Sequence, residues 1–213
     1  DDMIARDQWD ACELRVVKST RALLDLFDEH DTRATFFVLG WIAERVPELV
    51  REVGARGHEI ACHGYGHQRL TQLNAEAFDA DLGRALAILR RLSAAPVEGY
   101  RAPSFSLTKS TTWALPILRK HGIRWDSSIF PFGAHPEYGI ADAPITPHWL
   151  APGLLELPMT VLEVGGKRAP CTGGGYFRLF PYSVSRRLIA RVNAEGRAAT
   201  FYAHPWEFDP DQP

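Results

Sequence analysis

The chain has 213 residues, 46% of them hydrophobic and 23% charged, which predicts one globular domain with a sizeable core. The formal net charge of −2 offers no electrostatic basis for binding nucleic acid. No apolar run reaches the ~18 residues that a membrane-spanning helix needs, and the three widely spaced cysteines do not match a disulfide framework.

Segments with helical and strand-like patterns alternate along the chain. We expect helices over residues 19–29, 41–56, 74–92, 110–121 and 184–195. We expect strands over residues 34–39, 58–62, 97–101, 123–126 and 198–203, with one or two more within 154–164. Residues 131–152 are rich in proline and glycine, so we expect mostly loop there, bordering a functional cleft together with 173–178. Strands that alternate with helices predict a parallel sheet or barrel.

Two histidines follow the strand predicted over 58–62. His63 and His67 are four residues apart, which places both imidazoles on one side of a helical turn. Gly64 and Gly66 allow the tight backbone that lets the two rings converge. Neutral imidazoles so placed can hold one divalent cation. Histidines at this spacing also occur on ordinary surfaces, so the pattern alone leaves both interpretations open.

Polar side chains also follow three further predicted strands. Arg101, Asp126 and His204 each stand at or just past a strand end. In a barrel the strand ends on one face converge, so these side chains would surround one pocket with the histidine pair. The set fits metal-assisted hydrolysis, in which the cation polarises a carbonyl and activates water while His204 donates a proton.

Each of these three residues has a structural interpretation as well. Arg101 could be a surface cation or the structural partner of a carboxylate. Asp126 could close a turn through Ser127 and Ser128. His204 follows an apolar segment and precedes proline, so it could be packed in the core. The residues alone leave these alternatives open.

Four motifs together resemble the polysaccharide deacetylase family, the family 4-like carbohydrate esterases with a NodB homology domain. The motifs are Thr35 to Gly40, His63 to His67, Arg101 to Pro103, and Tyr202 to Glu207. The stretch from Gly173 to Arg178, taken with the last of these motifs, resembles the branch associated with bacterial exopolysaccharide and exosortase gene clusters.

The resemblance implies an α/β fold, a distorted (β/α)7-type barrel that lacks its first strand in this chain. It also implies a metal-dependent hydrolase that removes N-acetyl groups from an acetylated amino-sugar polysaccharide, either an exopolysaccharide or a cell-wall glycan. His63 and His67 would bind the divalent metal, for which we expect Zn²⁺. Arg101 would hold the basic aspartate of the family, and His204 would be the general acid.

Three more roles follow from the same resemblance. The backbone N–H near Ser104 would help to form the oxyanion site. Asp126 stands near the family's Asp-Trp pair, which accompanies the acid histidine. Tyr176 and Trp206 are expected to stack against the sugar, although aromatic side chains also fill protein cores.

The sequence departs from the family pattern in two places. The Asp-rich strand end that supplies the base and a third metal ligand should lie upstream of Trp9, and it is not found there. Asp1 and Asp2 are not preceded by an apolar strand. We therefore expect residues 1–213 to be one domain cut at both ends. In place of the Asp-Trp pair the chain reads Asp126-Ser127-Ser128.

Two other functions remain open. One is a related C–N hydrolase that acts on a small amide or ureide, and the other is a glycan-binding module without catalysis. In either case the expected partner is a small molecule or an acetylated glycan, with no nucleic acid and no membrane span. The oligomeric state and the compartment, bacterial cytoplasm or periplasm, are not determined by the sequence.

Overall fold

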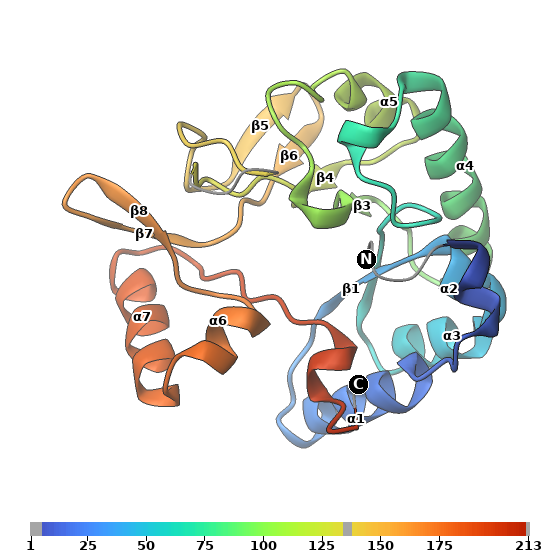
Figure 1. Ribbon diagram of the computed structural model, residues 1–213, viewed down its shortest axis with the longest axis horizontal. Coiled ribbons are helices and arrows are strands. Elements are labelled where there is room, and N and C mark those ends of the chain that lie inside the picture. Colours follow the sequence, from blue (N-terminus) through green and yellow to red (C-terminus); the bar gives the residue numbers. More distant parts are fainter. Residues whose placement is uncertain (1–5, 134–137, 212–213) are drawn as a thin grey trace.

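A computed structural model describes residues 6–133 and 138–211, and its centre is a mostly parallel sheet (Figure 1). The strands are β1 (Thr35–Val38), β2 (Glu59–Cys62), β3 (Gly99–Tyr100), β4 (Trp125–Asp126), β5 (His148–Ala151) and β6 (Leu154–Glu156). Their order is β1-β2-β3-β4-β6-β5, and only the β5–β6 pair is antiparallel. Parallel neighbours end at the same edge of the sheet, so the residues that follow β2, β3 and β4 come close together.

Five helices pack around this sheet on the right and lower sides of Figure 1. They are α1 (Val16–Glu29), α2 (Gly40–Arg45), α3 (Pro47–Ala55), α4 (Ala75–Leu92) and α5 (Ala114–Lys120). Helix α4 begins where the Asn74 side chain accepts a hydrogen bond from the Ala77 N–H at 2.8 Å. Its buried face carries Phe78, Leu82 and Leu86, and these belong to the main hydrophobic core with residues of the strands. The helix predicted over 74–92, with its apolar residues on one face, is therefore confirmed.

The helix predicted over 41–56 is two helices. Val46 breaks it with φ −130° and ψ 59°, and α3 then begins at Pro47. Proline disfavours a helical conformation in the residue before it and suits the first position of a helix. The break is therefore a local effect of Pro47.

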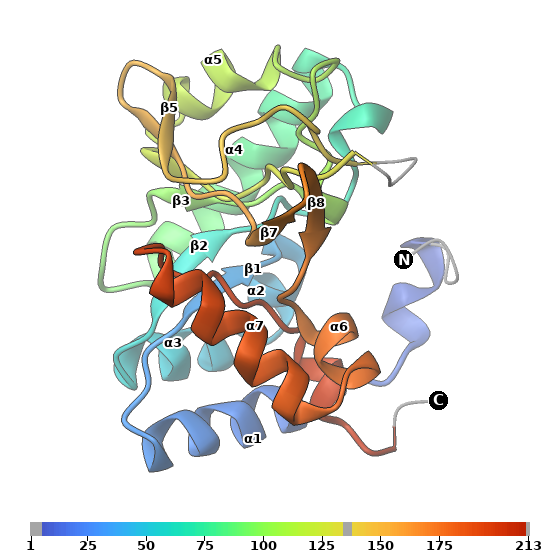
Figure 2. The same ribbon diagram turned by 90° about the vertical axis from the view of Figure 1, so that its left-hand side faces the viewer.

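The C-terminal third forms a second group of elements, on the left of Figure 1 and at the front of Figure 2. It contains the hairpin β7 (Val161–Val164) and β8 (Lys167–Pro170), then α6 (Gly174–Leu179) and α7 (Tyr182–Ala194). Leu162, Cys171 and Val192 form its own small buried cluster. The chain then returns to α1, where Arg15 Nε donates to Asp209 Oδ2 at 2.7 Å. Short 3-10 helices cover Arg6–Ala11, Leu70–Gln72, Pro103–Phe105 and Pro205–Phe208.

The prediction of a strand over 198–203 is wrong. This segment has no assigned secondary structure, because its backbone bonds go to other kinds of partner. Thr200 N–H donates to the Thr160 hydroxyl, and the Tyr202 carbonyl accepts from Gly174 N–H at the start of α6. Over the described residues the sheet is consequently open, with β1 at one edge.

The expected loop over 131–152 is partly correct. It contains the strand β5, which pairs with β6, and its residues 134–137 lie outside the described part of the chain. Asp1 and Asp2 also lie outside it. No helix within the described ranges has the length and apolar character to cross a membrane.

Candidate active site

His63 and Arg101 stand side by side because they directly follow two paired strands. Cys62, the last residue of β2, is in register with Tyr100, the last residue of β3. The Nδ1 atom of His63 lies 2.7 Å from the Arg101 carbonyl oxygen, which can only accept, so Nδ1 carries the hydrogen. The Nε2 atom of His63 is then the nitrogen with a lone pair, as in histidines that bind metals.

The His67 ring lies beside that of His63, with ring centroids 5.0 Å apart. Gly64 and His67 both have positive φ, 76° and 54°, and this turn folds the chain back within four residues. Burial, and then the nearby His67, lower the pKa of His63 to about 3. A neutral imidazole is the form that binds a metal ion.

The two rings fit a divalent cation in donor type and spacing, but they supply only two ligands. Across residues 6–133 and 138–211 no group of three or more His, Cys, Asp or Glu side chains is placed to hold a metal ion. Structural and catalytic zinc sites use three or four protein ligands. Within the described residues, this pair alone falls short of that number.

Arg101 points its guanidinium at the residues after β4. Its Nε donates to the Ser127 carbonyl at 2.8 Å and one terminal nitrogen donates to the Ser127 hydroxyl at 2.7 Å. The guanidinium carbon also lies 4.0 Å from the centre of the Phe37 ring. Burial lowers the pKa of Arg101 to about 10, so the group stays cationic at neutral pH. The hypothesis of an exposed surface cation is therefore wrong.

The turn after Arg101 has an unusual backbone. Ser104 and Phe105 both have left-handed φ angles, 53° and 51°, which cost free energy in residues other than glycine. The Phe105 ring packs against Phe130 and Tyr202, at 5.5 and 5.1 Å between centroids. These contacts hold the turn that carries Ser104, and they join it to the segment before His204.

His204 is the first residue of a compact polar group at the C-terminal end. Its ring stacks on Trp206 at 5.7 Å, and its Nδ1 lies 3.4 Å from Glu207 Oε2. The same carboxylate oxygen accepts from the His204 N–H at 2.7 Å. Burial lowers the pKa of His204, while Glu207 opposes that shift and His67 and Arg101 add to it. The contact between Phe105, four residues after Arg101, and Tyr202, two residues before His204, brings the two halves of the site near each other.

Helix α6 encloses the carboxyl group of Glu207. The Glu207 side chain is only 5% exposed, whereas that of His204 is 52% exposed. Arg178 reaches Glu207 Oε1 at 3.3 Å and lies over the Trp206 ring at 5.0 Å. A Cβ atom on Gly174 would overlap the Glu207 carboxyl group. The glycine-rich start of α6 thus makes room for this carboxylate.

Tyr176 is half-buried on the same helix. It stacks on Phe180 at 6.4 Å. Burial raises the pKa values of Tyr138 and Tyr202, and the nearby Tyr176 adds to both shifts. Trp206 is 44% exposed, so part of its ring is open to a ligand. Its place beside His204 suits the stacking role predicted for it, which stays a prediction.

Asp126 lies behind the site. It is fully buried, and it accepts hydrogen bonds from the Ser128 hydroxyl at 2.6 Å and the Ser128 N–H at 3.2 Å. The sequence left open that Asp126 closes a turn through Ser127 and Ser128, and the structure shows this turn. Of the described carboxylates, the one in contact with His204 is Glu207. Glu156, which sequence reasoning missed, is the buried in-register neighbour of Asp126 on β6.

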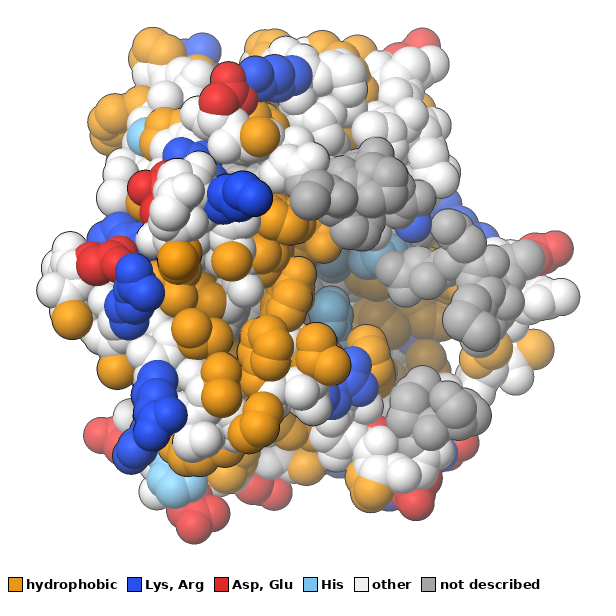
Figure 3. Space-filling model, turned by 60° about the vertical axis from the view of Figure 1, so that its left-hand side comes forward, with side chains coloured by type: hydrophobic (Ala, Val, Ile, Leu, Met, Phe, Trp, Pro, Cys, Tyr) orange, Lys and Arg blue, Asp and Glu red, His pale blue; other side chains and the backbone are white. Residues whose placement is uncertain are grey.

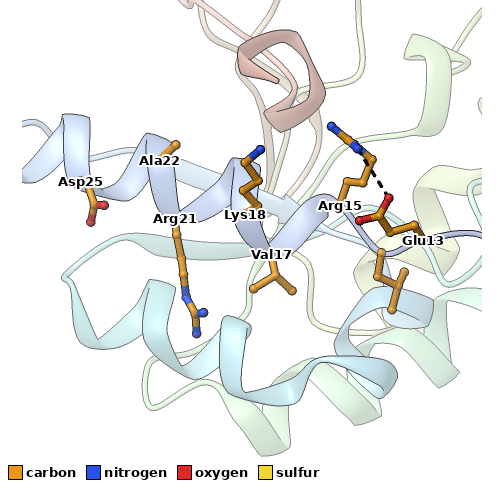
Figure 4. A pocket seen from close by; sticks show the side chains of 8 residues that line it. Glu13, Arg15, Val17, Lys18, Arg21, Ala22 and Asp25 are labelled. Atoms are coloured by element: carbon orange, nitrogen blue, oxygen red, sulfur yellow. Dashed lines mark ion pairs between the residues drawn. The ribbon is translucent and has the colours of Figure 1, made fainter. Parts of the chain in front are cut away.

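Figure 3 shows histidine side chains within a hollow whose rim carries many hydrophobic side chains. A separate groove runs along α1 and is lined by Glu13, Leu14, Arg15, Val17, Lys18, Arg21, Ala22 and Asp25. In Figure 4 its side chains point to both sides of the helix, and none of the candidate catalytic residues is among them. The candidate catalytic residues therefore lie outside this groove.

Comparison with known proteins identifies the family of most of the chain. Residues 7–125 match the family described as polysaccharide deacetylase, and residues 127–213 match a domain of unknown function, DUF3473. A peptidoglycan-N-acetylglucosamine deacetylase of Bacillus cereus is 36% identical over 86 residues, which are 40% of this chain and 29% of that protein. The chain thus spans well under half of that relative.

Two solved structures share the fold of this chain. A crystal structure of a candidate polysaccharide deacetylase from Mycobacterium smegmatis has a TM-score of 0.67 and 26% identity, covering 92% of this chain and 67% of that one. Puue allantoinase shares the fold, with a TM-score of 0.64 and 18% identity over 91% of this chain and 62% of its own. Since one family covers more than half of its length, this chain belongs to the polysaccharide deacetylase family.

Proposed function

We propose that this chain carries the histidine site of a metal-dependent N-deacetylase that acts on an acetylated amino-sugar polysaccharide. The observation that carries the proposal is the arrangement of His63 and His67 beside Arg101 on one side and His204 with Glu207 on the other. Family membership supports the reaction class, and the relative from Bacillus cereus supports an N-acetylglucosamine unit. The nature of the polysaccharide, an exopolysaccharide or a cell-wall glycan, is the finer part of the proposal.

His63 and His67 would hold the metal ion, for which zinc suits the neutral imidazole ligands. Such an ion polarises a bound carbonyl and lowers the pKa of water. The chain itself orients His63 as a metal ligand. The Arg101 carbonyl accepts a hydrogen bond from Nδ1 and so fixes the tautomer of the ring. His204 would donate the proton that the leaving amine requires, and its contact with Glu207 favours the protonated ring.

The surrounding residues would bind and orient the sugar. The left-handed turn at Ser104 follows Arg101 closely in the chain, and the Ser104 N–H would serve the oxyanion role. Trp206, which is 44% exposed, and the half-buried Tyr176 would provide aromatic surface for the sugar. Stacked aromatic rings bind the apolar face of a sugar and leave its hydroxyl groups solvated.

Acetate release from N-acetylglucosamine oligomers by the intact protein tests the proposal. We expect release that stops on chelation and returns with added zinc. O-acetylated xylan serves as the matched ester substrate, and slower release from it is expected. Binding of the oligomers without acetate release at any zinc concentration would contradict the proposal and favour a non-catalytic glycan-binding module.

A further inference from the structure

Two carboxyl groups are buried together beneath the arginine turn. Asp126 on β4 and Glu156 on β6 are directly in register, and both are fully buried. In-register residues on neighbouring parallel strands direct their side chains to the same face. The two groups are close enough to hydrogen-bond to each other. Two adjacent buried carboxylates cannot both be ionised at reasonable cost, so the pair must retain a proton.

The hydrogen-bond partners indicate which group carries that proton. Asp126 accepts two bonds from Ser128, which favour its charged form. Glu156 accepts one bond, from the Ile129 N–H to Oε1 at 2.9 Å, and its Oε2 has no donor among the described residues. Protonation at Oε2 turns that oxygen into a donor toward Asp126.

The pair is linked to the candidate site through Ser128. The Ser128 hydroxyl, held by Asp126, accepts from the Ala102 N–H at 2.7 Å. Ser127 binds the Arg101 guanidinium, and the Arg101 carbonyl in turn holds His63. The residual negative charge of the pair also faces the buried cation of Arg101.

We propose that Asp126 and Glu156 share one proton, and that this singly charged pair positions the Arg101–Ala102 turn, and through it His63. The pair acts through other residues and does not touch the substrate. The inference concerns the architecture of the turn and stands whether or not the chain is a deacetylase.

The other ionisable groups around the pair stay in place when Glu156 is replaced, so the titration of the pair can be measured separately from theirs. Arg101 is the cation that faces it, and Tyr100 is the neighbouring ionisable group on β3. His148 lies opposite Glu156 on β5, with its Nδ1 bonded to the Thr146 carbonyl. None of these is removed by a change at position 156.

Unfolding as a function of pH tests the shared proton in the 213-residue chain. Burial raises the pKa of Glu156 above its unfolded value, so the stability it confers is complete below ~4.3 and is lost as pH rises. One extra native proton makes the unfolding constant rise about tenfold per pH unit above that point. Glu156→Gln keeps the size and a donor but cannot titrate.

We expect the ratio of unfolding constants, wild type to Glu156→Gln, to rise about tenfold per pH unit between pH 5 and 7. The exposed Glu48→Gln serves as control and should give a constant ratio. Parallel curves for wild type and Glu156→Gln would overturn the shared proton. The infrared band of a protonated carboxyl in the wild type at pH 7 is the second measurement, and its absence would overturn the proposal even if the variant did not fold.

The positioning role needs its own readout. In the metal-free chain, ¹⁵N NMR of the His63 ring reports whether Nδ1 carries the hydrogen. We expect Ser128→Ala, which retains the carboxyl pair, to lower that population, while Glu156→Gln leaves it unchanged. An unaltered His63 tautomer in folded Ser128→Ala would refute the link from the pair to His63.

Discussion

Gly174 faces the carboxyl group of Glu207 so closely that a Cβ atom at position 174 would overlap it. The next residue, Gly175, has no atom within 4 Å of the place where its Cβ would stand. Of these two adjacent glycines in one helix, only Gly174 would bring an added Cβ atom against Glu207. Because Glu207 contacts His204, this relationship links the glycine-rich stretch to the proposed general acid.

Gly174→Ala should lower deacetylase turnover by up to ~10²-fold, the cost of misplacing a catalytic group by about 1 Å. Gly175→Ala is the matched control and should retain turnover, because both changes alter helix propensity equally. Turnover and melting temperature measured on both variants give the answer. Equal turnover in the two variants would show that the Glu207 contact does not matter.

Glu207→Gln should move the alkaline limit of activity to lower pH. Glu207 raises the pKa of His204 against the lowering by burial, so removing its charge makes the acid lose its proton earlier. The pH profile of kcat shows the shift, and Glu48→Gln should leave the profile unchanged. An unchanged alkaline limit would show that Glu207 does not affect the ionisation of the general acid.

His63→Ala and His67→Ala should each weaken zinc binding by at least ~10–100-fold, since even outer-shell partners of a metal site contribute that much. Isothermal titration with zinc measures the affinity directly. His30→Ala removes an exposed histidine elsewhere and should change nothing. Unchanged zinc affinity in the His63 and His67 variants would place the metal site elsewhere.

Asn74→Ala should lower the free energy of unfolding by about 1 kcal/mol, because it removes the side-chain cap of α4. The same substitution at Asn193, exposed near the end of α7, should change the stability much less. Urea unfolding of the two variants compares them directly. A loss at Asn193 as large as that at Asn74 would mean that the cap contributes nothing specific.

The sequence predicted those features that depend on local patterns. The apolar period and the Asn74 cap predicted α4, and the alternation of elements predicted the parallel sheet. The positions of His63 and Arg101 after neighbouring strands predicted that they would meet, and the 2.7 Å contact is the result. The proximity of His204 was predicted as well, although through a strand that does not exist.

Other features depend on contacts between distant segments. Residues 198–203 have a strand-like composition but contact Thr160 and the start of α6. No pattern in the sequence predicts these contacts. Helix α6 begins with glycines, which disfavour helix, so its packing decides its conformation. The pairing of Asp126 with Glu156 depends on the register of β4 and β6. The link from His204 to Glu207 could have been recognised, because the two residues are only three positions apart.

The most direct test of the proposed site is His204→Ala in the intact protein, with turnover, zinc content and melting temperature measured on one preparation. Loss of a general acid lowers the rate by ~10²–10⁴-fold. We predict a loss of that size while zinc content and melting temperature stay near the wild-type values. A folded, zinc-loaded His204→Ala protein with near-normal turnover would contradict the account.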